Sequence, residues 1–181
     1  MSEKITRSEF LKKLFGVAAE EVGKAVDRKV ASMAPKGIRP PWSQSETHFL
    51  STCEKCGGCG EICPQGIIRY FNSRAGLAVK TPYLDFKDAY CTYCGECVKV
   101  CPSGALNFEN GTKDLGLARI SAGRCAPAHE AGCAYCVDNC PEDAVIMSDA
   151  GFARVVESDC NGCGACIAGC KGEAIRIRIS K

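Results

Sequence analysis

Aromatic residues and histidines are scarce in this sequence. Only 7% of its 181 residues are aromatic, tryptophan occurs once, and there are two histidines, His48 and His129. So few aromatic side chains argue against a large hydrophobic core. We expect both histidines to be hydrogen-bonding or surface residues rather than metal ligands. No apolar run reaches about eighteen residues, so we expect no transmembrane helix.

Sequence motifs of enzymes are also missing. Phosphate-binding loops, nucleophile elbows and catalytic triads do not occur, so we expect no enzyme active site. The formal net charge of +2 counts every cysteine as neutral, and thiolates that hold metal clusters would make the charge negative. The slight basicity therefore gives no reason to predict nucleic-acid binding.

Cysteine, in contrast, is abundant and regularly spaced. Sixteen cysteines fall into four runs of four. Run 1 is Cys53, Cys56, Cys59 and Cys63; run 2 is Cys91, Cys94, Cys97 and Cys101; run 3 is Cys125, Cys133, Cys136 and Cys140; run 4 is Cys160, Cys163, Cys166 and Cys170. Runs 1, 2 and 4 share the spacing Cys-x2-Cys-x2-Cys-x3-Cys, run 3 has a wider first gap, and proline follows each of the first three runs.

This spacing is typical of bacterial ferredoxins that bind [4Fe–4S] clusters. In such proteins the fourth cysteine of each run ligates the other cluster of a pair. Glycines between the cysteines allow the backbone to approach a cluster closely, and a proline after the fourth cysteine turns the chain away from it. The sequence therefore predicts four [4Fe–4S] clusters with all sixteen cysteines as ligands, in an electron-transfer protein rather than an enzyme.

Two other uses of cysteine fit this pattern less well. A disulfide scaffold requires an oxidising compartment, and no secretory signal is visible. Zinc sites separate two Cys-x2-Cys halves by a longer loop, whereas each regular run places four cysteines within eleven residues. We therefore expect iron–sulfur clusters, in a protein of the reducing cytoplasm.

The rest of the chain divides into three predicted regions. Residues 1–34 contain apolar residues at three- and four-residue steps, which predicts an amphipathic helix. Residues 35–50 are rich in proline and predict an extended linker. Residues 51–181 contain the four runs, and a short apolar stretch typical of a strand follows each run. The expected fold is α+β, with two ferredoxin-like dicluster modules made of four half-units.

The linker carries the most distinctive segment of the chain. Gly37-Ile38-Arg39-Pro40-Pro41-Trp42-Ser43 is followed by Glu46-Thr47-His48-Phe49-Leu50 and run 1. This arrangement, together with the wide gap in run 3, resembles the NapF-type ferredoxins of periplasmic nitrate reductase systems. The resemblance implies a cytoplasmic accessory protein that binds the catalytic molybdenum subunit of such a reductase and assists its maturation before export, by delivering electrons or an iron–sulfur cluster. The alternative is an electron-relay polyferredoxin subunit of a respiratory oxidoreductase complex.

Two interpretations of residues 38–50 remain open at this point. The segment can lie as a strap across the protein's own cluster domain. It can instead dock onto a partner, because Arg39, Trp42 and Phe49 are the kind of side chains that anchor interfaces.

The pairing of the runs is also open. Consecutive pairing joins run 1 with run 2 and run 3 with run 4, whereas nested pairing joins run 1 with run 4 and run 2 with run 3. The family looks related to four-cluster subunits of molybdenum oxidoreductases, and that resemblance implies the nested scheme. Cys170 would then lie beside run 1, and Cys101 beside run 3.

Overall fold

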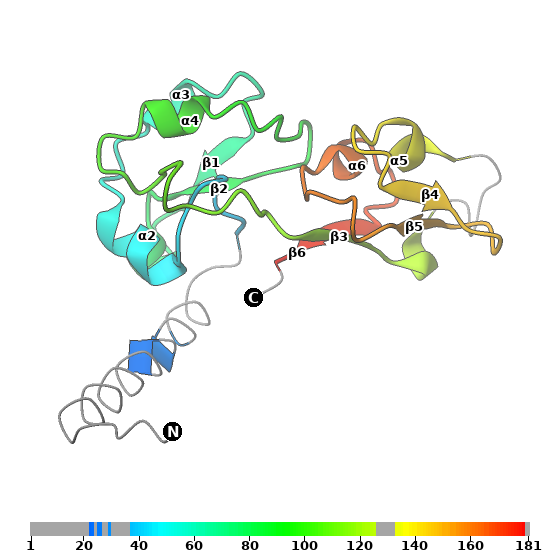
Figure 1. The fold of residues 1–181 in the computed structure, drawn as a ribbon, viewed down its shortest axis with the longest axis horizontal. Coiled ribbons are helices and arrows are strands. Elements are labelled where there is room, and N and C mark those ends of the chain that lie inside the picture. The colour runs from blue at the N-terminus through cyan, green and yellow to red at the C-terminus, as the bar shows by residue number, and fades with distance from the viewer. Residues whose placement is uncertain (1–21, 24, 27–28, 30–36, 126–132, 180–181) are drawn as a thin grey trace, which may run out of the picture.

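The protein has two modules. The computed structural model describes residues 22–23, 25–26, 29, 37–125 and 133–179. The helix expected over residues 1–34 lies outside these ranges, apart from the five described positions before residue 30. Figure 1 shows two lobes side by side, which we call the first module (residues 37–115) and the second module (the described residues of 117–179). No helix in the described ranges is long and apolar enough to span a membrane.

The first module contains one short antiparallel strand pair and several short helices. Its elements are α2 (Glu46–Thr52), α3 (Gly58–Glu61), β1 (Ile68–Tyr70), the 3-10 helix η1 (Gly76–Ala78), β2 (Pro82–Leu84) and α4 (Glu96–Lys99). Strands β1 and β2 pair with Ile68 opposite Leu84. This hairpin connects run 1 to run 2 and brings the second run back beside the first.

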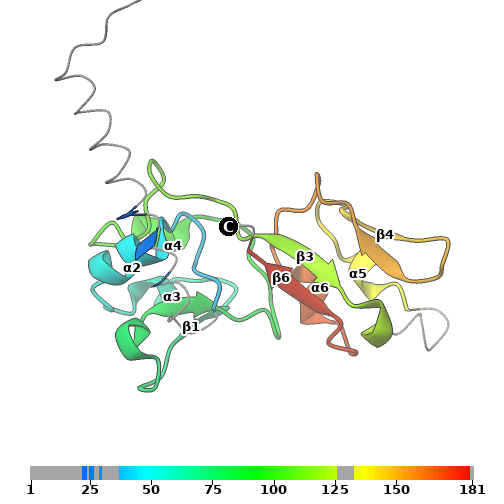
Figure 2. The same cartoon turned by 90° about the horizontal axis from the view of Figure 1, so that it is seen from below.

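The second module repeats this plan and adds a second strand pair. Its elements are β3 (Leu117–Ile120), the 3-10 helix η2 (Ala122–Arg124), α5 (Tyr135–Asp138), β4 (Val145–Met147), β5 (Ala153–Val155), α6 (Ala165–Ala168) and β6 (Ile175–Arg178). The β4–β5 hairpin connects runs 3 and 4, and β3 pairs antiparallel with β6. Figure 2 shows β3 and β6 beside each other, on the side of the second module that faces the first. The sequence Ile175-Arg176-Ile177-Arg178 alternates apolar and basic residues, which predicts a half-buried strand. In β6, Ile175 is buried and Arg176 is exposed, which confirms this prediction.

Each module has its own small core, and cysteines form part of both. Phe49, Leu84 and Cys97 belong to the core of the first module. Cys125 and Cys166 belong to the core of the second. Both cores are small, as the low aromatic content predicts, and the thiols contribute to the packing directly.

Residues 37–45, which we call the strap, lie against the first module. Ile38 bridges Leu84 of β2, and Ser43 bridges both Leu106 and Thr112. The Trp42 amide donates to the Thr112 carbonyl at 2.6 Å, and the Thr112 amide donates to the Ser43 carbonyl at 3.1 Å. The strap therefore forms β-bridges with the first module. In the second module, strands β3 and β6 pair with each other.

This packing bears on the docking interpretation of the same segment. Phe49 is 1% exposed and Arg39 is 8% exposed, so neither is available to a partner in this conformation. Trp42 packs edge-on against Phe108, with ring centroids 5.0 Å apart, and against Tyr93. The strap interpretation thus describes the fold. Helix α2 begins at Glu46, inside the predicted linker, and the proline-rich composition does not predict it.

Candidate iron–sulfur sites

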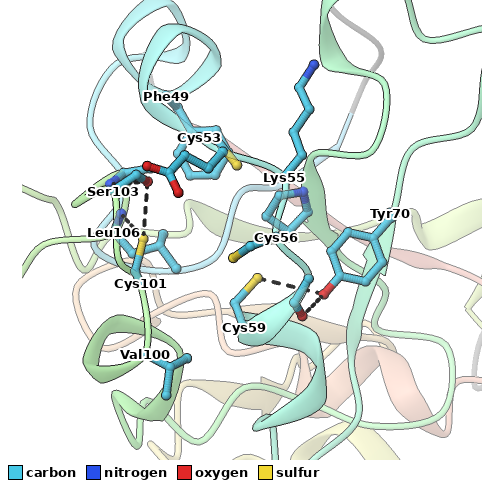
Figure 3. A pocket seen from close by; sticks show the side chains of 14 residues that line it. Phe49, Cys53, Lys55, Cys56, Cys59, Tyr70, Val100, Cys101, Ser103 and Leu106 are labelled. Atoms are coloured by element: carbon cyan, nitrogen blue, oxygen red, sulfur yellow. Dashed lines mark hydrogen bonds between the residues drawn. The ribbon is translucent and has the colours of Figure 1, made fainter.

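Four cysteines from runs 1 and 2 converge in the first module. Cys53, Cys56, Cys59 and Cys101 line a hollow of about 370 Å³. Figure 3 shows that their side chains extend into the same space between α2, α3 and the turn that follows α4. We call this group site A.

The other twelve cysteines form three similar groups. Site B consists of Cys63, Cys91, Cys94 and Cys97, which line a hollow of about 360 Å³. Site C consists of Cys140, Cys160, Cys163 and Cys166, which line a hollow of about 290 Å³. Site D consists of Cys125, Cys133, Cys136 and Cys170. In site D, burial raises the pKa of Cys136 to about 11, and the negative charges of the other three cysteines add to the effect.

These groups correct the nested pairing of the runs. Cys101 lies beside run 1 and not beside run 3, and Cys140 lies beside run 4 and not beside run 2. The β1–β2 and β4–β5 hairpins explain this, because each returns the chain at once to the preceding run and closes only a short loop. In every site the fourth cysteine of one run joins the first three cysteines of its consecutive partner.

The backbone conformation of the cysteine loops repeats from run to run, as their sequence does. In runs 1, 2 and 4, the residues just before and just after the second cysteine have positive φ. They are Lys55 and Gly57, Tyr93 and Gly95, and Gly162 and Gly164. The third residue after every fourth cysteine also has positive φ: Gly66, Gly104, Asp143 and Glu173. Four of these ten residues are not glycine, and such strain, about 1–3 kcal/mol per residue, is typically found where a functional site requires it.

In runs 2, 3 and 4, the turn after the fourth cysteine directs a backbone amide at its sulfur. Sγ of Cys101 accepts from the Leu106 amide at 3.4 Å, and Sγ of Cys140 accepts from the Ala144 amide at 3.3 Å. Sγ of Cys170 accepts from an amide in the same way. Such hydrogen bonds stabilise a negatively charged sulfur and tune the potential of a cluster bound to it.

The cysteine groups suit a cluster better than a single metal ion. Within the described residues, no three histidine, cysteine or acidic side chains lie close enough together to hold one ion. A cubane instead offers a separate iron atom to each of four thiolates. The four-cysteine hollows, the amide donors and the left-handed loop residues all fit a [4Fe–4S] cluster.

Two residues that the cysteine pattern does not reveal support site A. The Tyr70 hydroxyl accepts from the Gly60 amide at 3.0 Å and donates to the Gly57 carbonyl, so it holds the loop of run 1 (Figure 3). Arg39 lies buried behind Phe49, which lines the hollow. The only sequence signal for Tyr70 is that it is an aromatic residue in the strand that follows run 1. The only sequence signal for Arg39 is its place in the strap motif.

Only one of the two histidines lies in the described part of the chain. The His48 ring lies 3.0 Å from the Gln44 side-chain amide, which fits the expected hydrogen-bonding role. His129 lies outside the described residues.

The four sites follow one another in the order A, B, C, D. Burial raises the pKa of Cys97 in site B to about 12, and the charge of Cys59 in site A adds to this rise. Burial likewise raises the pKa of Cys166 in site C to about 12, with a contribution from Cys136 in site D. Each module therefore places its two sites close together.

Sites B and C meet across the boundary between the modules. The Cys91 amide donates a hydrogen bond to the Cys163 carbonyl at 2.9 Å. Next to it, the Tyr93 hydroxyl donates to the Asn161 carbonyl. A cysteine of site B is thus bonded through its backbone to a cysteine of site C, which connects the two pairs of sites.

Comparisons with known proteins agree with this arrangement. Residues 52–105 and residues 131–175 each match a family described as a 4Fe–4S dicluster domain. The chain is 37% identical over 149 residues to the ferredoxin-type protein NapF of Haemophilus influenzae, which covers 80% of this chain and 81% of the relative. It is 32% identical over 182 residues to the ferredoxin-type protein NapG of Escherichia coli, covering 91% of this chain and 79% of the relative. It is also 30% identical over 172 residues to the methylamine utilization ferredoxin-type protein MauM of Methylobacillus flagellatus, covering 87% and 74%.

The match to NapF covers most of both chains, and the two dicluster domains lie where the structure forms its two modules. The chain therefore belongs to the NapF family of ferredoxin-type proteins and carries four [4Fe–4S] clusters, with a role in electron transfer.

Proposed function

We propose that this protein relays electrons through both modules, between site A and site D. A bound [4Fe–4S] cluster accepts and returns an electron at a potential set by its surroundings. The sixteen cysteines are the proposed ligands, and backbone amides stabilise the charge on Cys101, Cys140 and Cys170. Cys56 in site A and Cys133 in site D are exposed, so both ends of the series are open to an exchange partner.

The observation that supports this proposal most strongly is the contact between Cys91 and Cys163. Without such a contact, the two modules would be separate dicluster ferredoxins joined by a linker. With it, the route from Sγ of Cys91 to Sγ of Cys163 crosses covalent bonds and a single hydrogen bond. The contact therefore favours one relay of four centres over two independent pairs.

For the physiological role, we propose a cytoplasmic accessory protein of a periplasmic nitrate reductase system. It would bind the catalytic molybdenum subunit before export and assist maturation by delivering electrons or an iron–sulfur cluster. Membership of the NapF family supports this role. The second candidate is a relay subunit of a respiratory oxidoreductase complex, which the linear order of the sites favours.

An anaerobic pull-down from cytoplasmic and membrane fractions tests the role. We expect the four-cluster protein to recover an unexported catalytic subunit that still carries its signal sequence, from the cytoplasmic fraction. A second arm uses Cys163→Ala, which removes a proposed ligand of site C and interrupts the relay at its middle. If electron delivery is the function, this variant should bind the same subunit but reduce it at least tenfold more slowly.

One result would count against the accessory role, and another would count against the relay. A stable complex in the membrane fraction would favour the respiratory relay. Normal reduction of the partner by Cys163→Ala would show that electrons do not need to cross from the first module to the second.

A further inference from the structure

A buried ion pair lies behind site A. The Arg39 guanidinium donates to both carboxylate oxygens of Glu46, at 2.9 and 2.5 Å. It also donates to Oγ1 of Thr81 at 2.8 Å and to the carbonyl of Pro82 at 2.7 Å. The side chains of Arg39 and Glu46 are only 8% and 14% exposed. Solvent therefore screens these two charges weakly.

The position of this pair connects it to site A. The guanidinium lies over the Phe49 ring, 4.7 Å from its centroid, and both Phe49 and Pro82 line the hollow of site A. Glu46 begins helix α2, and Cys53 caps its C-terminal end. A single layer of side chains therefore separates the charged pair from the cysteines that surround this hollow.

The two charges of the pair act in opposite directions on a cluster bound at site A. A nearby cation favours the more negative of two states. Reduction makes a cluster more negative, so the same cation favours the reduced form, and the Glu46 carboxylate opposes it.

We propose that the Arg39–Glu46 pair sets the reduction potential of site A. This inference rests on the proposed relay function. In that relay, the reduction potential of site A determines how readily electrons enter or leave at that end. If the Arg39–Glu46 pair only stabilised the packing, charged side chains would not be required at these positions. Replacing a buried pair with apolar residues is often neutral or stabilising.

The test is EPR-monitored potentiometry of the full chain with its four clusters. Glu46→Gln keeps the shape and a hydrogen-bond acceptor but removes the negative charge. We expect this change to favour reduction at site A about tenfold, which is 59 mV for a one-electron couple. Arg39→Met removes the positive charge, and we expect a shift of similar size in the opposite direction. The site A signal is identified as the one that Cys56→Ala abolishes.

The control is Glu157→Gln, which breaks the ion pair between Arg119 and Glu157. Both of those side chains are about half exposed, so we expect no shift at site A. Shifts of the same sign in Glu46→Gln and Arg39→Met would indicate general damage and overturn the proposal. The absence of any shift in Glu46→Gln would overturn it as well, and this variant decides alone if Arg39→Met does not retain its clusters. Because the potential is measured on the isolated protein, failure of the pull-down leaves this result unaffected.

Discussion

Removing the iron–sulfur clusters should abolish the folded structure. The described strands have three or four residues, and the described helices of the cysteine loops have four, which is too short for independent stability. Cysteines also form part of both cores. Metal binding and folding are therefore expected to be coupled, as in other small metal-binding domains.

The measurement is far-UV circular dichroism during anaerobic chelation, followed alongside the visible absorbance of the clusters. We expect both to be lost together, and no cooperative thermal transition in the iron-free chain. A zinc-free, iron-free protein that keeps its strand signal and unfolds cooperatively would show that the polypeptide alone maintains the fold.

A single added methyl group should detach the strap. A Cβ at Gly111 would overlap the backbone carbonyl of Trp42 and the carbonyl of Asn107. The backbone cannot move aside there without breaking the hydrogen bonds that hold Trp42 and Ser43 to the module. Overpacking of this kind costs about 1–3 kcal/mol or more, and we expect Gly111→Ala to destabilise the first module by at least that amount.

Limited proteolysis and the rate of cluster loss in air would measure this effect. Gly111→Ala should be cleaved within the strap and should lose the first module's clusters faster than the unchanged protein. Gly123→Ala is the matched control, because a Cβ there meets no atom within 4 Å. Equal rates for the two variants would show that the strap contributes nothing to the integrity of the module.

The four [4Fe–4S] clusters could be predicted from the sequence because the proposed ligand cysteines follow one another at fixed short spacings. The strand alternation of residues 175–178 is equally local, and the structure confirms it. Pairing of the runs is not local. Cys101 joins Cys53 because a hairpin returns the chain, and no feature of the cysteine spacing specifies that return.

The strap is a second feature that depends on contacts that the sequence pattern does not predict. Arg39 and Trp42 look like docking residues when composition alone is considered. Only the structure reveals that Glu46, seven residues further on, neutralises Arg39 in a buried position. The positive φ of Lys55, Tyr93, Asp143 and Glu173 was also unforeseeable, because non-glycine residues rarely adopt it.

Double substitution of proposed cluster ligands tests the central claim, the consecutive pairing of runs, most directly. Cys56 and Cys101 both line site A, so Cys56→Ala/Cys101→Ala should disturb one cluster only. Mössbauer spectroscopy of the iron-labelled protein should then find about twelve iron atoms in intact [4Fe–4S] clusters, four for each undisturbed site. The control, Cys56→Ala/Cys163→Ala, disturbs sites A and C and should leave about eight such iron atoms. If Cys56→Ala/Cys101→Ala also left only about eight, the two cysteines would belong to different clusters, and the arrangement of two consecutive dicluster modules would be wrong.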